Sequence, residues 1–502
     1  MDGLVGIQRI VVHEPKVSAN RIRTAFELIR RGCKTETVTY DVRYDQDVLA
    51  LDSEVDSALA RMVALQPLVN MGLFAGRVET EFPLDPLDVA FLNELLRAIS
   101  KEILINRVHD PVHSVVDERD RPPFRKRRSY ADVVLAAPGQ PPSRVGSRAT
   151  PDSVGVLLNT APEAMLNAAV FRDIGAPVIG LVVSTGAADQ RVGEDLASRL
   201  GAGGLAVAQV SSNLESVLAS LAEHVRAIQH GPASKKGRAR FACYVRGPSV
   251  FALLPLLRAR GVGLLALPDR YPGHLPEPFH GVSHYGGRYE HTRYFHDLLT
   301  RYLMERGPTV DVFSPLAPLG EMAVLKVLAQ GFPTSLAQWM PCPTPKTTTR
   351  KVSPCGDCES CRRAAAQLVS VEADPARVGL GPDALKSLFR EGLTSKENDP
   401  ETVEEVRVRL ARLGWNVRNG DASAAPPASF RRELERLRFD NRMTFIDTIP
   451  KRHRAHFYRR LLDFIPGALV WTGDDWTDFD LLSSKEMQRE KVLFAPSLAS
   501  AA

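Results

Sequence analysis

Apolar residues between positions 153 and 267 follow a pattern that predicts strands alternating with helices. The predicted strands are short apolar runs at 154–158, 177–183, 205–210 and 263–267. The predicted helices are 162–174, 193–200, 214–228 and 249–260. A polar segment at 230–240 interrupts the pattern, which resumes with one more predicted strand at 241–245. Such alternation favours a parallel sheet with helices on both faces.

The flanking regions have different patterns and predict three further segments. Residues 1–137 predict an α+β domain, with strands at 5–13 and 35–43 and an amphipathic helix at 86–105. The stretch 138–152 is rich in proline, glycine and serine and predicts a linker. The α/β domain then covers 153–365, and 366–502 predicts a mostly helical C-terminal region.

Composition and charge narrow the class of protein. The chain has 502 residues, of which 44% are hydrophobic and 25% charged, as in a globular protein of several domains. It has no apolar run of membrane-spanning length, and residues 1–16 lack the pattern of a signal peptide, so we expect a cytoplasmic protein. A net charge of +5 is too small to indicate nucleic-acid binding.

Four of the six cysteines cluster, which indicates a metal site in a cytoplasmic chain. Cys355, Cys358 and Cys361 form two CxxC steps, and Cys342 lies thirteen residues upstream. Four thiolates suit tetrahedral zinc in a closed, structural site. A redox pair and an iron–sulfur cluster are the alternatives. Arg362 and Arg363 would begin a helix beside the negative centre.

The cluster resembles the zinc knuckle of the 7-cyano-7-deazaguanine synthases, which are PP-loop ATP-pyrophosphatases with a HUP-like fold. In that family a cysteine precedes C-G-x-C-x-x-C, as Cys342 precedes Cys355-Gly-Asp-Cys358-Glu-Ser-Cys361 here. Ser314-Pro-Leu-Ala-Pro-Leu-Gly-Glu321 resembles the family's Pro-Leu segment before an acidic helix. Tyr289-Glu-His-Thr-Arg293 stands where the family has Tyr-Pro-Asp-Cys-Arg. The resemblance covers residues 150–365 and implies a doubly wound parallel sheet with a zinc knuckle.

The phosphate-binding loop of that family, S-G-G-x-D-S, is degenerate in this chain. The matching residues are Asn159, Thr160, Ala161, Pro162, Glu163 and Ala164. Both glycines are replaced, and Pro162 removes an N–H donor that could bind phosphate. Thr160 and Glu163 have the spacing of a capping box, which would satisfy the N-terminus of the following helix from within the chain. We therefore expect that neither ATP nor magnesium binds here, and we assign no catalytic residue.

Three other segments carry chemistry that the sequence leaves open. In residues 284–296, Tyr285 and Tyr289 could stack a purine-like ring, and Arg288 and Arg293 could attract an anion. The same segment could instead be a loop leading into a core helix. The basic run 121–128 could contact an acidic partner or RNA, or be a solvated loop. The acidic and aromatic segment 471–480 could be an interaction segment, a hydrated metal site or a surface turn.

Two functions from different classes follow from the resemblance. The first is a non-catalytic subunit that binds a 7-deazaguanine-like ligand and pairs with a homologue whose PP-loop is intact, or with itself. The basic run 121–128 and the aromatic segment 285–294 are the expected contact regions. The second is an ATP-dependent ligase that forms an amide or nitrile on a 7-carboxy-7-deazaguanine-like acid, with a rebuilt loop. Residues 159–164 discriminate them, since only an enzyme needs a phosphate cradle there.

Overall fold

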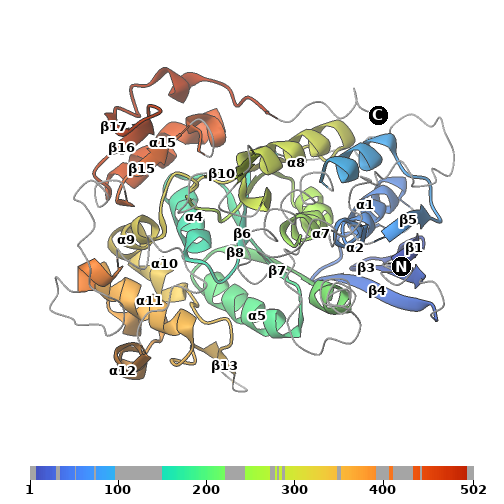
Figure 1. Ribbon diagram of the computed structural model, residues 1–502, viewed down its shortest axis with the longest axis horizontal. Coiled ribbons are helices and arrows are strands. Elements are labelled where there is room, and N and C mark those ends of the chain that lie inside the picture. Colours follow the sequence, from blue (N-terminus) through green and yellow to red (C-terminus); the bar gives the residue numbers. More distant parts are fainter. Residues whose placement is uncertain are drawn as a thin grey trace.

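The computed structural model has one large central sheet with smaller elements around it (Figure 1). It describes residues 7–29, 34–50, 53–72, 75–95, 150–220, 244–271, 277–279, 282–284, 289–347, 352–391, 406–410, 434–440 and 444–494. The predicted basic run 121–128 and most of the predicted linker lie outside these residues; residues 150–152 already belong to a strand. No helix in the described ranges is both long and apolar enough to cross a membrane.

Five strands form the parallel part of the sheet, in the order β12-β9-β6-β7-β8. They are β6 (Thr150–Leu158), β7 (Val178–Ser184), β8 (Ala206–Ser212), β9 (Val262–Ala266) and β12 (Asp311–Phe313). From β6 the chain moves outward through β7 and β8, and then returns to place β9 on the other side of β6. In parallel sheets the crevice at such a reversal, beyond the carboxyl ends of the strands, is the usual place for ligands. The mixed α/β fold and the largely parallel central sheet are confirmed.

Helices cover both faces of these strands, and the burial pattern shows why. Val156 and Leu158 pack in one core cluster with α4 (Pro162–Asp173) and α5 (Ala187–Ala202). Leu157, on the opposite face of β6, packs in the other cluster with α7 (Arg246–Ala259) and α8 (Arg293–Arg306). Because strand side chains alternate between faces, an apolar run with no polar position is buried on both sides.

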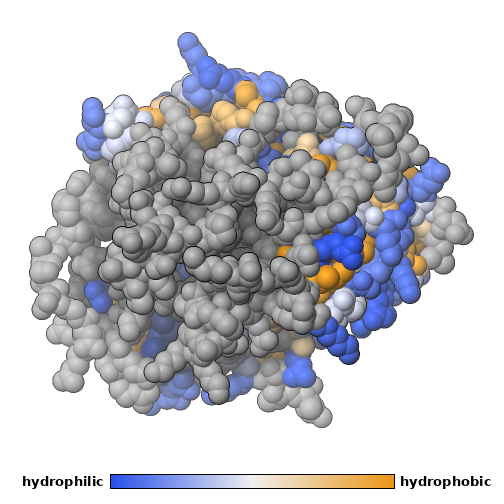
Figure 2. All heavy atoms as spheres, turned by 45° about the vertical axis from the view of Figure 1, so that its right-hand side comes forward, coloured by the Kyte–Doolittle hydropathy of each residue, from blue (hydrophilic) through white to orange (hydrophobic). Residues whose placement is uncertain are grey.

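The N-terminal strands extend the same sheet with antiparallel pairs, except that β1 and β5 pair in parallel. They are β1 (Ile7–Val12), β2 (Lys16–Ser18), β3 (Arg21–Ile29), β4 (Glu36–Tyr44) and β5 (Ala75–Thr80). β4 pairs with β8, so the strands on either side of the predicted linker form one continuous sheet. The helices α1 (Glu54–Leu65) and α2 (Leu68–Gly72) lie beside them. Figure 2 brings this side forward; the described residues there are largely hydrophilic, with hydrophobic atoms visible between them.

Several predicted elements differ from the structure. The strand predicted at 241–245 is wrong in its described part, since Tyr244 and Val245 lead directly into α7 without pairing in a sheet. Residues 86–95 of the helix predicted at 86–105 are helical, and the rest lies outside the described residues. Residues 214–220 are helical as predicted. The strand β3 was missed by the sequence analysis.

The C-terminal half combines helices with small sheets. The helices are α9 (Glu321–Gly331), α10 (Pro333–Gln338), α11 (Glu359–Ser370), α12 (Pro382–Glu391) and α15 (Lys451–Leu462). Two short hairpins pair β10 (Glu277–Phe279) with β11 (Val282–His284), and β13 (Lys346–Thr347) with β14 (Val352–Ser353). A three-stranded sheet, β15 (Leu437–Phe439), β16 (Ala468–Trp471) and β17 (Trp476–Phe479), adds strands to a region that was predicted to be mostly helical. Segment 471–480 contains the turn between β16 and β17 and the whole of β17.

Candidate functional site

The four clustered cysteines come from two arms that meet beside α11. Cys342 follows α10, and the β13–β14 hairpin carries the chain back to Cys355. Gly356 then turns with a φ of +83°, a conformation that side chains other than glycine rarely adopt. Cys358 is the N-cap of α11, and its sulfur accepts a hydrogen bond from the backbone N–H of Cys361. The turn and the cap thus bring Cys355, in the loop, beside Cys358 and Cys361, in the first turn of α11.

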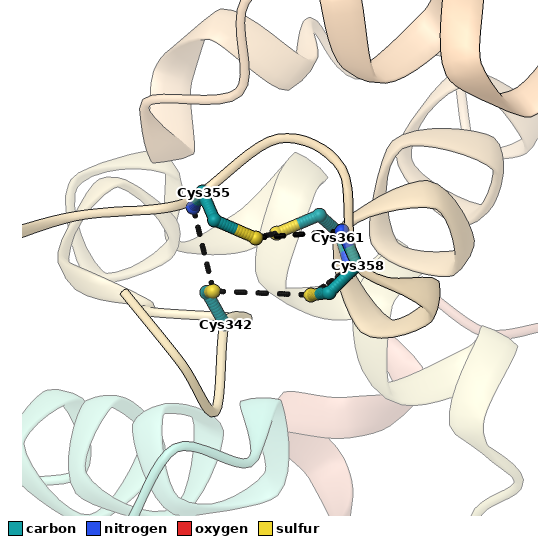
Figure 3. Close-up of side chains that lie close together, drawn as sticks. All are labelled: Cys342, Cys355, Cys358 and Cys361. Carbon is teal, nitrogen blue, oxygen red and sulfur yellow. Dashed lines mark hydrogen bonds between the residues drawn. The ribbon is translucent and has the colours of Figure 1, made fainter. Parts of the chain in front are cut away.

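The sulfur positions match those of a tetrahedral metal site (Figure 3). The Sγ atoms of Cys342 and Cys358 are 3.9 Å apart, and those of Cys355 and Cys361 are 3.8 Å apart. All four lie within 4.8 Å of one another. Metal–sulfur bonds of about 2.3 Å in a tetrahedron give sulfur–sulfur distances of about 3.8 Å. The four cysteines can therefore hold one metal ion in a closed site.

Backbone N–H groups stabilise negative charge on the sulfur of Cys355. Cys342 Sγ accepts from the N–H of Cys355, and Cys355 Sγ accepts from the N–H of Cys358, each at 3.4 Å. Burial raises the pKa of Cys355, but N–H donors from Cys358 and Asp357 outweigh it and bring the pKa to about 7. Disulfide bonds require sulfurs about 2.05 Å apart, so these cysteines are thiols rather than a disulfide pair.

The loop after β6 begins α4 in a way that contradicts the predicted capping box. Pro162 is the first residue of the helix, so Ala161 is the N-cap, and no side chain caps it. Thr160 lies one residue too early to cap, and its carbonyl accepts a hydrogen bond from Trp339 Nε1 at 2.8 Å. The side chain of Asn159 instead accepts from the N–H of Ala161. The Glu163 carboxylate pairs with Arg270 rather than with the N–H of Ala161, which the Asn159 side chain holds.

Glu163 takes part in a buried network of alternating charges. Arg270 contacts Glu163 and Glu321, each at 3.0 Å, and Arg363 lies 3.6 Å from Glu321. The side chains of Glu163 and Glu321 are 2% and 3% exposed. Burial raises the pKa of Glu163 above its usual value, although Arg270 opposes this. Burial acts on Glu321 too, but Arg270 and Arg363 outweigh it and lower its pKa. Glu163 lies in the first turn of α4 and Glu321 in the first turn of α9, and arginines of the same chain neutralise both carboxylates.

A cavity of about 190 Å³ is lined by this network and by neighbours of the cysteines. One wall is the loop after β6, from Thr160 to Glu163, with Arg270 and Glu321 beside it. The other wall comes from the two arms that bear the cysteines. It consists of Trp339, Pro341, Pro343, Ser360, Arg363, Ala364 and Gln367. The sequence analysis found the loop and the cysteines separately, and the fold brings them to one cavity.

The predicted ligand residues of segment 284–296 are only partly within the described residues. Tyr285 and Arg288 lie outside them. Tyr289 is buried and packs edge-on against Phe295. Arg293 is 5% exposed and binds Asp297, Asp447 and the carbonyl of Val492. The guanidinium therefore joins α8 to the C-terminal region.

The sequence analysis missed a second polar cluster at the carboxyl end of β9. The Asp269 side chain is 1% exposed and accepts from Arg246, His291, His296 and Ser314. Burial raises its pKa, but Arg246 and His291 outweigh this and hold the pKa well below its usual range. An acidic residue directly after an apolar strand of a parallel sheet was the available signal.

Comparison with known proteins adds no relative: neither a scan against protein-family models nor a search of curated proteins finds a match for this chain. The proposals that follow therefore rest on the geometry of the described residues and on the motifs of the sequence.

Proposed function

We propose that the chain is a non-catalytic scaffold subunit, related to the 7-cyano-7-deazaguanine synthases and stabilised by zinc. The observation that carries the proposal is the buried Glu163 carboxylate, which pairs with Arg270 in the first turn of α4. In the family that the sequence resembles, this turn binds phosphate through free N–H groups. Here the same turn already holds an anion that belongs to the chain.

Charge and geometry both oppose a phosphate at this position. An incoming phosphate would meet Glu163 and Glu321, two carboxylates on either side of Arg270. Like charges in a partly buried site repel strongly, and displacing Glu163 from its pair would leave a buried charge uncompensated. Pro162 offers no N–H, and the N–H of Ala161 is taken by Asn159. Loss of ATP use follows from these contacts.

Calorimetry with magnesium-ATP at millimolar concentration tests this function. We expect no saturable heat from the full chain, and no release of pyrophosphate. Arg270→Gln provides the matched variant, since any true phosphate site in this cavity would need that guanidinium. Saturable binding by the wild type that Arg270→Gln abolishes would refute the proposal.

Zinc is the metal that the cysteine centre suits best. A set of four thiolates with no open position is the usual structural zinc site, and its role here is to join the arm before Cys342 to α11. Elemental analysis of protein purified without added metal should give close to one equivalent of zinc. Iron with a visible absorption band would support the iron–sulfur alternative instead.

As a scaffold, the chain acts through a partner: a homologue with an intact PP-loop, or a second copy of itself. A fold that retains a metal centre without its reaction is maintained for its surface. Size-exclusion chromatography with light scattering, alone and after co-expression with genes adjacent to its own, provides the test. A monomer that captures no homologue and does not self-associate would contradict this role.

The second candidate function is the ATP-dependent ligase, and the cavity beside the cysteine centre favours it. That cavity has the position of a ligand site in a doubly wound sheet, and two arginines line it. Because the ligase needs ATP in this cavity and the scaffold does not, the calorimetric experiment separates the two.

A further inference from the structure

The hairpin of β16 and β17 carries a row of three aromatic rings. Trp471 and Trp476 face each other across the two strands with ring centroids 5.4 Å apart, and Tyr271 packs on Trp476 at 6.2 Å. The N–H of Thr472 donates to the carbonyl of Asp475 at the turn. The next pair, formed by the two tryptophans, is therefore a non-hydrogen-bonded pair, in which cross-strand side chains lie closest. The row runs from the buried tyrosine to the half-buried tryptophans.

The inner end of this row already holds a cation from the same chain. The guanidinium carbon of Arg438 lies 3.8 Å from the ring centroid of Tyr271, and Arg438 is 5% exposed. The Tyr271 hydroxyl donates to Asp440 at 3.2 Å. A guanidinium thus stacks on an aromatic face close to a carboxylate. At the outer end the tryptophans again lie beside carboxylates, and no cation of the described residues stacks on them.

The carboxylates at the outer end are exposed. Asp474 and Asp475 lie in the turn, and Asp480 directly follows β17. Asp475 accepts from the N–H of Trp476, and Asp480 accepts from that of Ser483. No lysine or arginine in the described ranges pairs with any of these three aspartates. Because the whole chain has a net charge of +5, this acidic surface has the sign opposite to that of the protein around it.

β17 is also the outer strand of its sheet. The strand order is β15-β16-β17, and no strand of the described chain lies beside β17 on its other side. Figure 1 shows the hairpin at the end of the molecule away from the N-terminal strands. An outer strand exposes backbone groups to which an extended segment can add. Leu482, which is 37% exposed, places an apolar side chain just beyond the strand.

The charges and the rings together decide which occupant fits this edge. A second copy of the same edge would bring carboxylates against carboxylates, and like charges across strands repel. A neutral segment would gain nothing from the carboxylates. A basic segment would pair with them and could place a guanidinium on the tryptophans, as Arg438 does on Tyr271.

We propose that the outer edge of β17 docks an extended, arginine-containing segment of a partner protein. An arginine of the partner stacks on Trp471 and Trp476, and Asp474 and Asp475 pair with the partner's cations. The proposal deepens the scaffold role and rests on it, since it names a surface through which the scaffold holds its partner. This surface is separate from the contact regions 121–128 and 285–294 that the sequence suggests.

The docking edge and the scaffold role can fail separately. ATP binding by the chain would refute the scaffold role, and peptide binding at the hairpin would still be measured in the same protein. A chain that binds neither ATP nor a basic peptide would refute only the docking edge.

The test titrates the full chain into a fluorescently labelled hexapeptide that alternates arginine and threonine, followed by fluorescence anisotropy. We expect saturable binding at sub-millimolar concentration. The matched peptide replaces each arginine with citrulline, which keeps the shape of the side chain and removes its charge. It should bind at least tenfold more weakly, since both the ion pairs and the stacked cation are lost.

Two variants of equal net charge locate the bound peptide. Asp474→Asn combined with Asp475→Asn removes both carboxylates of the turn and should weaken binding about fivefold. Glu194→Gln combined with Asp383→Asn removes two exposed carboxylates on α5 and α12 and should bind like the wild type. Because both proteins lose the same charge, a difference between them comes from the turn and not from the overall field.

Trp471→Leu tests the aromatic part of the surface. It keeps an apolar side chain in β16 and removes the ring on which the cation stacks, so binding should weaken about fivefold. Circular dichroism establishes that the variant folds. If it does not fold, the citrulline peptide and the two variants of equal charge still decide.

The competing occupants are the chain's own basic run 121–128 and a second copy of the chain. A variant with glutamine at the basic positions 125–128 should bind the peptide like the wild type, and a tenfold gain would show that the run already occupies the edge. A dimer that the two turn substitutions dissociate would identify a second copy. Either result overturns the proposal. So does a lack of saturable binding, equal binding of the two peptides, or equal affinity of the two charge-matched variants.

Discussion

The loop after β6 and neighbours of the cysteine centre line one cavity, and the loop and the centre neutralise charge in different ways. The centre gathers four thiol ligands in a tetrahedral arrangement that is complete only with a cation from outside. The loop places a carboxylate at the start of α4 and neutralises it with Arg270 from the same chain. One region thus offers a site for an external ion, and the other carries its own counter-ion.

This difference shows two ways in which an α/β fold can balance charge beside one cavity. An anion at a helix N-terminus is favourable whether it belongs to a ligand or to the protein. Supplying the anion from the first turn of the helix keeps that stabilisation and removes the need for a bound phosphate. The cysteine centre has no such internal substitute, because a carboxylate or amide cannot replace the metal that four sulfurs surround.

The largest effect should come from removing one metal ligand of the cysteine centre. Cys358→Ala takes away both a metal ligand and the N-cap of α11. Structural zinc contributes about 10–16 kcal/mol in small zinc domains, which exceeds the whole stability of many proteins. We expect the variant to lose its metal and the packing of α11, measured by elemental analysis and limited proteolysis. Cys33→Ser, outside the cluster, is the control and should keep its zinc.

The next largest effect concerns Asp269, at the carboxyl end of β9, whose charge is also neutralised by side chains of the same chain. Asp269→Asn leaves Arg246 without its buried carboxylate and should reduce the free energy of unfolding by about 3 kcal/mol at pH 7. Because the pKa of Asp269 is lowered on folding, its contribution is present above about pH 4, the unfolded value, and is lost as the pH falls toward the folded pKa.

Urea unfolding at several pH values measures this dependence. The difference between wild type and Asp269→Asn should narrow below about pH 4. Asp383→Asn, at an exposed position of α12, controls for the general effect of losing a carboxylate. A difference that stays constant down to pH 3 would contradict the assigned role of Asp269.

A smaller effect should come from substituting Glu163, which would let an external anion pair with Arg270. Glu163→Gln removes one of the two carboxylates that flank Arg270, so inorganic sulfate should now stabilise the chain. We expect sulfate to raise the melting temperature of this variant more than that of the wild type, at matched ionic strength. Glu194→Gln, on the surface of α5, should respond like the wild type. Equal shifts in all three proteins would mean that the glutamate does not close the site.

The smallest effect tests the contact that joins the two regions. Trp339, on the arm before Cys342, donates from Nε1 to the carbonyl of Thr160 in the loop. Trp339→Phe removes this hydrogen bond together with part of the buried indole, which should cost about 2 kcal/mol. Chemical denaturation measures the loss, and Trp471→Phe in the C-terminal hairpin serves as control. A neutral result would show that the two regions fold without this connection.

The cysteine site could be predicted because its information is local. Three ligands lie within seven residues and the fourth is close in sequence, so residue type and spacing suffice. The parallel strands were predictable for the same reason, since strands buried on both faces form continuous apolar runs. The sequence does not reveal that Arg270 neutralises Glu163, because 107 residues separate them and only the fold brings them together.

The errors also have physical causes. The capping box failed because Pro162 sets the first residue of α4, which shifts the cap from Thr160 to Ala161. The C-terminal sheet was missed because β15 has three residues and pairs with a strand almost thirty positions later. The strand predicted at 241–245 was an apolar run that leads into α7, and such short runs do not distinguish a strand from a buried helix start.

The pairing of β4 with β8 has a consequence for dissecting this chain. A fragment that begins at residue 150 would keep all five parallel strands but uncover the edge of β8, where Val42, Arg43 and Tyr44 now pair. A bare strand edge is a template for association with other chains, and the fragment would also expose the faces of α7 and α8 that pack against N-terminal residues in one core cluster, so it should aggregate. Expression trials should therefore truncate the chain outside this pairing, or replace β4 with another strand that protects β8.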